Sequence, residues 1–207
     1  MIVAIVALTC IISIYAFSRP ELISLLALWP HRMAQRGEWY RLLTHMFVHG
    51  GGWHLAINML VFYSFGSYIW DMFGWMQFRF FSSASLHLPM LYFGGGVVAA
   101  LVSYLTRRRD PSYISIGASA GVSAIVFTSI TLAPWAPIYL FGLVPLPGIL
   151  MGIAFLIYSW YSSRRANQHI DHMAHFYGAI YGFLYPMLTA EGTAQHFLQQ
   201  LLHFTTY

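Results

Sequence analysis

Residues 117–132 read GASAGVSAIVFTSITL, an apolar run without a charged residue that begins with small side chains around Ser119. Residues 172–188 read HMAHFYGAIYGFLYPML, a second apolar run in which Gly178 and Gly182 lie four positions apart. Small residues at this spacing let two helix backbones approach closely inside a membrane. The two runs therefore predict a pair of tightly packed membrane helices, on which the rest of the fold is built.

The composition supports a membrane protein. Of the 207 residues, 58% are hydrophobic and only 8% are charged, whereas a soluble domain usually carries about 25% charged residues. Most of the protein surface must therefore face something other than water, and no soluble domain remains between the apolar runs. We expect one membrane-embedded domain over residues 1–207, in contact with the lipid bilayer.

Six apolar stretches are candidates for crossing a bilayer. They predict an all-α, polytopic bundle of six transmembrane helices in which spans two, four and six are parallel. A long, partly polar loop between spans one and two is expected at the membrane interface, and the Gly- and Pro-interrupted residues 138–147 are expected to lie along the membrane. The spans cover approximately residues 2–17, 53–70, 88–105, 118–132, 148–161 and 172–188.

A serine and a histidine are candidates for a catalytic pair. Ser119 lies in the first turn of span four and His175 in the first turn of span six, so both are expected at the same membrane face. Close packing of the spans would bring the hydroxyl within reach of the imidazole, as a base-activated nucleophile requires. The alternatives are plain helix packing around Ser119 and an interfacial histidine that is satisfied by water or carbonyl groups.

A series of polar side chains precedes and enters span two, and its members are Arg41, His45, His49, His54 and Asn58. His54 and Asn58 share one helix face and could donate hydrogen bonds to a developing oxyanion. The free amide groups at the start of span four would add donors there. Alternatively, Asn58 could form an interhelical hydrogen bond whose only role is to hold two spans together. His45 and His49 are expected to be structural and to hydrogen-bond the loop backbone.

Taken together, these motifs resemble the rhomboid family of intramembrane serine proteases over nearly the whole chain. The resemblance implies a Ser119–His175 dyad, with an oxyanion hole made by His54, Asn58 and the amide of Ser119. It also implies cleavage of a substrate's transmembrane helix near its end, through an acyl-enzyme and without a metal or other cofactor. The matching motifs are Tyr40–Arg41, the series His45, His49, His54 and Asn58, the run Gly117–Ala118–Ser119, and Ala174–His175 followed by Gly178 and Gly182.

Two positions depart from the family pattern. Ala120 stands where the family usually has glycine directly after the serine, and its methyl group could tighten or hinder substrate approach. Ser123 replaces an aromatic that commonly packs on the histidine, so the orientation of His175 is expected to depend on other neighbours, such as Tyr177 or Tyr181. A catalytically inactive scaffold or chaperone that binds membrane helices is therefore the alternative function.

Other classes of protein fit less well. A helical zinc protease needs a glutamate beside its first histidine, and Met46 occupies that position here. No Asp or Glu lies inside a predicted span, which argues against an intramembrane aspartyl protease and against a Ser-His-Asp triad. No basic stripe with interleaved aromatics lies outside the membrane, so we expect no nucleic-acid partner.

The arginine distribution and the family resemblance imply opposite orientations of the protein in the membrane. All ten basic residues are arginine, and nine of them fall on the predicted active-site side, which by the positive-inside rule would place that side in the cytoplasm. The family resemblance implies that the site opens to the extracytoplasmic side, and we adopt that orientation. The expected location is an integral, multi-pass position in the cell membrane.

Overall fold

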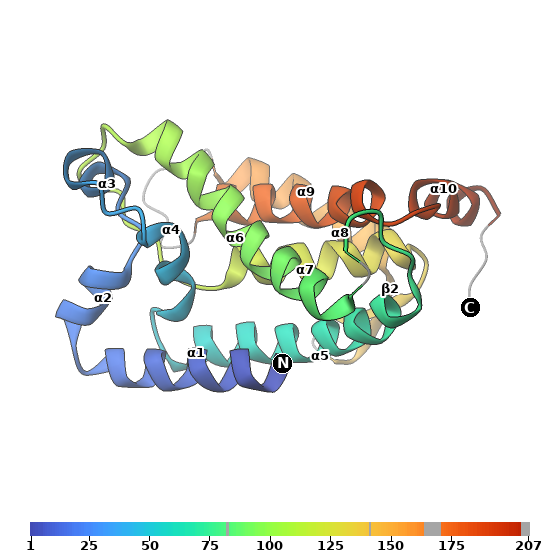
Figure 1. The fold of residues 1–207 in the computed structure, drawn as a ribbon, viewed down its shortest axis with the longest axis horizontal. Coiled ribbons are helices and arrows are strands. Elements are labelled where there is room, and N and C mark those ends of the chain that lie inside the picture. The colour runs from blue at the N-terminus through green and yellow to red at the C-terminus, as the bar shows by residue number, and fades with distance from the viewer. Residues whose placement is uncertain (82, 141, 164–170, 204–207) are drawn as a thin grey trace.

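The computed structural model describes the chain apart from residues 82, 141, 164–170 and 204–207. Every stretch predicted to cross the membrane forms a helix (Figure 1), although most of these helices extend a few residues beyond the predicted limits. These helices are α1 (Ile2–Phe17), α5 (Gly52–Trp75), α6 (Ala84–Arg107), α7 (Ser119–Leu132), α8 (Gly148–Ser162) and α9 (His172–Thr189).

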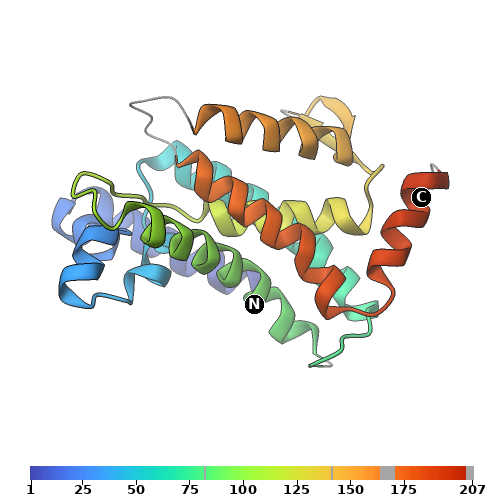
Figure 2. The same ribbon diagram turned by 90° about the horizontal axis from the view of Figure 1, so that it is seen from above.

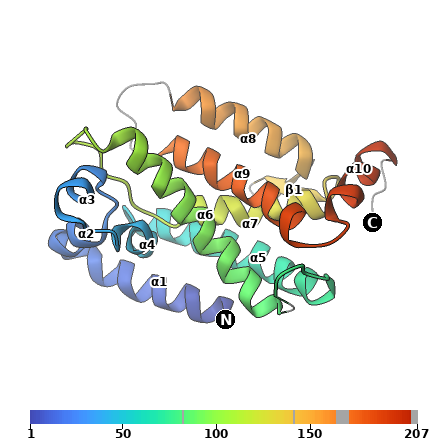
Figure 3. The same cartoon turned by 45° about the horizontal axis from the view of Figure 1, so that its top comes forward.

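Helix α7 is the centre of the bundle. Twelve of its 14 residues are buried, and it packs against α5, α6 and α9. Helix α8 lies at one edge of the bundle (Figure 2), and Figure 3 shows α1 at the edge opposite to it. Because α7 is enclosed by its neighbours, the side chains at its first turn are held by tertiary contacts on several sides.

The contact between α7 and α9 is unusually close, as the glycine spacing predicts. A Cβ atom at Gly178 would lie 2.2 Å from the carbonyl oxygen of Ala120, and one at Gly182 would lie 2.0 Å from that of Ala124. The hydroxyl of Thr128 on α7 donates to the carbonyl of Gly182 at 2.7 Å. The predicted packing of these two helices at their small residues is confirmed.

The connection from α1 to α5 folds into several short helical turns. Proline stands at the first position of both α2 and α3, where the missing N–H costs nothing because the first amides of a helix have no helical partner. This connection packs beside the end of α6. Its elements are α2 (Pro20–Leu26), α3 (Pro30–Arg36), α4 (Arg41–Thr44) and the 3₁₀ helix η1 (His45–Phe47).

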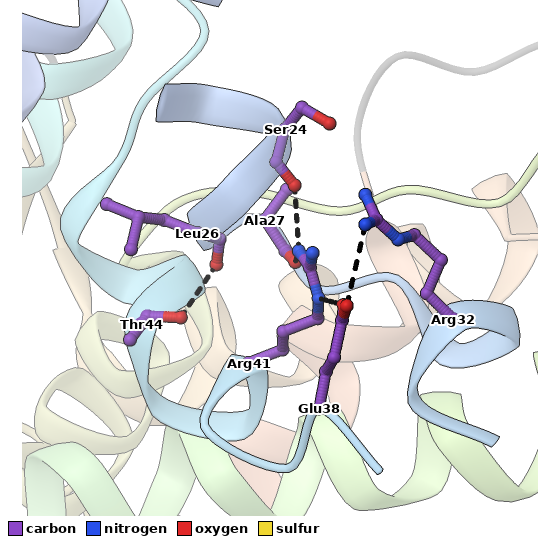
Figure 4. Close-up of polar contacts among 7 residues, drawn as sticks. All are labelled: Ser24, Leu26, Ala27, Arg32, Glu38, Arg41 and Thr44. Atoms are coloured by element: carbon purple, nitrogen blue, oxygen red, sulfur yellow. Dashed lines mark hydrogen bonds and ion pairs between the residues drawn. The ribbon is translucent and has the colours of Figure 1, made fainter. Parts of the chain in front are cut away.

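Arg41 holds this connection together from inside (Figure 4). Its side chain is fully buried, and it donates to Glu38 at 2.6 Å and to the carbonyls of Ser24 and Ala27 at 2.8 and 2.6 Å. The hydrogen bond from Arg41 lowers the pKa of Glu38 below its usual value. The glutamate also pairs with Arg32 at 3.4 Å.

These ion pairs affect the count of arginines that was used to predict the orientation of the protein in the membrane. Arg41 and Arg32 are engaged with Glu38 inside a folded connection, so their charge is partly neutralised. They are therefore weaker indicators of a cytoplasmic side than arginines in an open loop. Arg164 and Arg165, which also entered the count, lie outside the described residues.

The all-α expectation is wrong for the segment between α7 and α8. Strands β1 (Pro137–Leu140) and β2 (Val144–Pro147) pair antiparallel in a short hairpin. Gly142 in its turn has a φ of 74°, a conformation that favours glycine. Pro145 and Pro147 interrupt a helix but are tolerated in an edge strand. Beyond α9, the chain forms an eleven-residue helix, α10 (Thr193–His203).

Within the described residues, one helix, α6, is both long enough and apolar enough to cross a membrane by length and composition alone. Helices α1, α7 and α8 are apolar but have only 14 to 16 residues. At about 1.5 Å per residue they are shorter than the roughly 30 Å hydrocarbon core of a bilayer.

Candidate active site

Ser119 and His175 meet at one end of the bundle. The hydroxyl oxygen of Ser119 lies 2.7 Å from Nε2 of His175, and both side chains are half-buried. Helices α5, α7 and α9 all begin at this end (Figure 1). The predicted hydrogen-bond contact between span four and span six is therefore present in the structure.

The geometry of this contact suits proton transfer. A serine hydroxyl has one hydrogen, and an imidazole nitrogen with a free lone pair can accept it. When Ser119 donates to Nε2, the neutral ring of His175 carries its own proton on Nδ1. This arrangement pairs a nucleophile with a base.

Two aromatic rings orient His175. The ring of Phe155 on α8 is stacked on it at a centroid distance of 6.2 Å, and the ring of His172 meets it edge-on at 6.0 Å. We expected neighbours such as Tyr177 or Tyr181 in this role, and the structure places Phe155 and His172 against the ring. The hydroxyl of Tyr181 instead donates to a carbonyl of α6 at 3.1 Å. The sequence gives no signal for Phe155, because it lies on a different helix, 20 positions away.

The backbone just before Ser119 is held by the loop that precedes α5. The N–H of Gly117 donates to the carbonyl of His45 at 2.9 Å, and the N–H of Ala118 donates to Nε2 of His49 at 3.3 Å. Gly117 has a φ of 114°, which side-chain-bearing residues rarely adopt. The backbone that leads to Ser119 therefore turns at Gly117 and is held by hydrogen bonds to His45 and His49.

His49 connects this backbone to α1. Because its Nε2 accepts from Ala118, its Nδ1 carries the proton and donates to the hydroxyl of Ser13 at 2.9 Å. Ser13 in turn donates to the carbonyl of Phe47 at 2.8 Å. Burial lowers the pKa of His49 to about 3, so the ring stays neutral and keeps this arrangement of donors.

Sequence reasoning missed Ser13. The signal that could have found it is the pair Thr9 and Ser13, two polar residues one turn apart in an otherwise apolar helix, and both are fully buried. His45 is also buried, with Nδ1 3.0 Å from the carbonyl of Arg41. Burial lowers its pKa to about 4. His45 and His49 therefore make the backbone contacts that were expected of them.

His54 lies beside the glycine that precedes the serine motif. A Cβ atom at Gly117 would lie 2.8 Å from Cε1 of His54 and 3.1 Å from its Nε2. The N–H of Gly50 points at Nδ1 of His54 at 3.4 Å, so the ring proton belongs on Nε2. His54 therefore places an N–H donor next to the loop that carries Ser119.

Asn58 lies one turn further along α5 and is buried. Its amide nitrogen donates to the carbonyl of His54 at 2.8 Å, which uses one of its two N–H groups. The first backbone hydrogen bond of α7 runs from Val122 to Ala118 at 3.0 Å. The preceding amides, including that of Ser119, have no partner inside the helix and are available to an anion.

A cavity of about 200 Å³ lies between α5, α7 and α8, one turn along α7 from the serine. Ser123, the residue that replaces the expected aromatic, lines it and contributes a hydroxyl to an otherwise apolar wall. Ala120 is only 3% exposed, so its additional methyl group is enclosed by protein. The lining residues are Val61, Val122, Ser123, Val126, Phe127, Ile130, Met151, Gly152 and Phe155.

In the part of the chain that the structure describes, no group of three or more His, Cys, Asp or Glu side chains is placed to hold a metal ion. Both ring nitrogens of His49 take part in hydrogen bonds. They are therefore engaged in holding the loop.

Comparison with known proteins identifies a matching family. The family model described as "Rhomboid domain" matches residues 36–192. This range contains the serine, the histidine that contacts it and the whole histidine series. It leaves out α1, from which Ser13 reaches the loop.

The individual relatives share between 26% and 32% sequence identity with this chain. The Bacillus subtilis (strain 168) protein named "Putative rhomboid protease YdcA" is 26% identical over 155 residues, which cover 75% of this chain and 69% of that protein. The Arabidopsis thaliana "RHOMBOID-like protein 12, mitochondrial" is 32% identical over 149 residues, 69% of this chain and 44% of that protein. The human "Presenilin-associated rhomboid-like protein, mitochondrial" is 32% identical over 154 residues, 70% and 36% respectively. The chain thus matches less than half the length of these two mitochondrial relatives.

Proposed function

The chain belongs to the rhomboid family, and on this premise we propose that it is an intramembrane serine endopeptidase. The proposed reaction is cleavage of a peptide bond within or near a transmembrane helix of another membrane protein. The reacting groups are Ser119 and His175, and the reaction needs no metal or other cofactor. The observation that carries the proposal is the 2.7 Å contact between the hydroxyl of Ser119 and Nε2 of His175.

The first half of the reaction forms an acyl-enzyme. The oxygen of Ser119 attacks the carbonyl carbon of the substrate while its proton passes to Nε2 of His175. The N–H groups of Ser119 and of the His54 ring, with the amide of Asn58, stabilise the oxyanion that forms. His175 then gives the proton to the leaving amine, and the carbon–nitrogen bond breaks.

The second half restores the enzyme. A water molecule gives a proton to His175 and attacks the ester carbon, and the serine oxygen leaves and takes the proton back. The new terminus of the substrate departs as a carboxylic acid. Both Ser119 and His175 are partly exposed, which is consistent with entry of water at this end of the bundle.

The proposed substrate is a single-span protein with small residues at the cleavage site. A helical peptide hides its carbonyl groups in its own hydrogen bonds, so the substrate helix must unwind locally before attack. The apolar cavity of about 200 Å³ one turn along α7 from Ser119 is suited to an apolar side chain of the unwound segment. Its position between α5 and α8 supports approach of the substrate from the lipid through these helices.

The proposed location is an integral, multi-pass position in a membrane, with α1, α5, α6, α7, α8 and α9 as its six spans. The exposed apolar side chains on α1 and α8, which include Ile11, Ile14, Ile153 and Ile157, support contact with lipid on both edges of the bundle. We retain the cell membrane as the proposed compartment and the extracytoplasmic side as the proposed side of the active site.

Labelling with a serine-directed fluorophosphonate tests the proposal. We expect the purified protein in detergent to be labelled, and mass spectrometry to place the label on Ser119. Among the described residues, its hydroxyl is the one placed to donate to a histidine nitrogen, whereas the hydroxyl of Ser13 accepts from His49. Ser129→Ala is the matched control, since Ser129 lies on the same helix but bonds to its own backbone at 2.7 Å. Labelling elsewhere on the chain would mean that the nucleophile is misassigned.

The same experiment separates the protease from the alternative. An inactive scaffold or chaperone would bind membrane helices without an activated serine, and it would remain unlabelled although folded. Complete absence of label from the folded wild-type protein, together with absence of substrate cleavage, would favour that alternative.

Replacing Asn58 by alanine tests the oxyanion site. We expect kcat to fall by about 100-fold, or roughly 3 kcal/mol, because one preorganised donor is lost from the transition state. KM should change little. Steady-state cleavage of a transmembrane substrate measures both values.

Asn58→Asp provides the control for shape, since it keeps the size of the side chain but removes its N–H donors. We expect it to be at least as slow as Asn58→Ala. Wild-type kcat in either variant, with the thermal midpoint unchanged, would assign Asn58 to helix packing alone.

A further inference from the structure

A second polar contact joins the two segments that carry Ser119 and His175. The hydroxyl of Tyr113, in the connection between α6 and α7, donates to the carboxylate of Asp171. Asp171 is the N-cap of α9, and its other carboxylate oxygen accepts the N–H of Ala174 at 3.0 Å. Tyr113 thus lies six positions before the serine and Asp171 four positions before the histidine.

Tyr113 is itself held firmly. Its hydroxyl oxygen lies 3.1 Å from that of Ser103 on α6. Because the single phenolic hydrogen goes to the carboxylate, the Ser103 hydroxyl can donate to the phenol oxygen. Burial, followed by the charge of Asp171, raises the pKa of Tyr113. The phenol therefore stays protonated and remains a donor.

The segment on both sides of Tyr113 is also fixed. The carboxylate of Asp110 accepts the N–H and the hydroxyl of Ser112 at 3.0 and 2.6 Å. Ser115 and Leu28 exchange backbone hydrogen bonds at 2.9 and 3.0 Å. These hydrogen bonds therefore hold Tyr113 in place on the connection that leads to Ser119.

Asp171 occupies the corresponding place on α9. The N–H of His175 points at the carbonyl of Asp171 at 3.3 Å, so the N-cap and the histidine belong to the same helical turn. A charge-assisted hydrogen bond is stronger and more directional than a neutral one. The bond from Tyr113 therefore constrains where the first turn of α9 sits relative to the start of α7.

We propose that Tyr113 and Asp171 are positioning residues that hold the imidazole of His175 in register with the hydroxyl of Ser119. The glycine contacts fix how closely α7 and α9 approach, and this hydrogen bond fixes their first turns at the reacting end. The inference rests on the proposed function, since it assigns a role in the same serine–histidine reaction. Neither residue touches the reacting atoms.

Two variants each remove one partner of the hydrogen bond between Tyr113 and Asp171. Tyr113→Phe keeps the ring and removes the hydroxyl. Asp171→Ser keeps an N-cap for α9, because serine caps helices well, but removes the oxygen that accepts from Tyr113. We expect each to lower both kcat and the rate of fluorophosphonate labelling on the order of 10-fold, because small displacements of reacting groups reduce rates strongly. KM and the thermal midpoint should stay near the wild-type values.

The double variant and a control complete the test. If the two residues act through their shared bond, Tyr113→Phe combined with Asp171→Ser should be no slower than the slower single variant. Tyr104→Phe, which removes a hydroxyl on α6 beside Ser103, should react like wild type. Wild-type rates in both single variants, multiplicative losses in the double variant, or a loss confined to KM would each overturn the inference.

Different experimental results would refute this inference and the proposed function. Absence of wild-type labelling at Ser119 would remove the serine protease proposal itself. Normal wild-type labelling combined with undiminished labelling of Tyr113→Phe would remove only the positioning role. If Tyr113→Phe does not fold, Asp171→Ser still decides the question, because it preserves the tyrosine and the helix cap.

Discussion

Replacing Ser119 by alanine is expected to lower cleavage of a transmembrane substrate by about 100,000-fold or more, to the background rate. His175→Ala should have a similar effect, because the hydroxyl of Ser119 is a weak nucleophile unless a base removes its proton. The two groups lie 2.7 Å apart and act as one unit. The double variant should therefore be no slower than either single variant.

The measurement is turnover of a reconstituted substrate in proteoliposomes, with thermal denaturation as the check on folding. Ser129→Ala is again the matched control and should retain the wild-type rate. Turnover by Ser119→Ala within tenfold of wild type would disprove the assignment of the nucleophile. Activity of His175→Ala with loss of activity in Ser119→Ala would mean that another group removes the proton.

Replacing Gly182 by alanine is expected to damage both folding and catalysis. The added Cβ would lie 2.0 Å from the carbonyl oxygen of Ala124 and 2.4 Å from its Cα. These are backbone atoms, which cannot turn aside as a flexible side chain can. Helices α7 and α9 must therefore move apart, which also breaks the hydrogen bond from Thr128 to the carbonyl of Gly182.

We expect the thermal midpoint of Gly182→Ala to fall by roughly 10 °C, since overpacking of this kind costs about 3 kcal/mol. Labelling of Ser119 should slow by about 100-fold, because a displacement of about 1 Å separates the reacting groups. Thermal scans and labelling rates in the same detergent measure both effects.

Gly74→Ala is the control for this substitution. Gly74 lies in α5, and an added Cβ would meet no atom within 4 Å. Alanine should therefore be neutral or stabilise the helix by up to about 1 kcal/mol. Equal behaviour of Gly74→Ala and Gly182→Ala would show that α7 and α9 tolerate a wider spacing than the structure has.

Much of the candidate site could be predicted from the sequence. The parity of the apolar runs indicated that Ser119 and His175 begin two parallel helices, and the glycine spacing indicated how these helices pack. His45 and His49 were expected to hydrogen-bond the loop backbone, and their rings contact the carbonyl of Arg41 and the N–H of Ala118. Each of these inferences depended on local periodicity or on a known family pattern.

Other features could not be predicted because no local pattern encodes them. Phe155 contacts His175 from a helix that lies at the edge of the bundle, and Ser13 reaches His49 across 36 positions of sequence. The bond between Tyr113 and Asp171 spans 58 positions. The same Asp171 also caps α9 by accepting the N–H of Ala174.

The sequence by itself determined that the chain is built from apolar helices and that two of them approach at glycines, because hydrophobic periodicity and side-chain size are local properties. It also determined which serine and histidine are candidates for catalysis. Tertiary structure alone decided which ring orients His175 and which side chains hold the backbone before Ser119. These outcomes depend on which distant surfaces come into contact, and that choice is made only when the whole bundle packs.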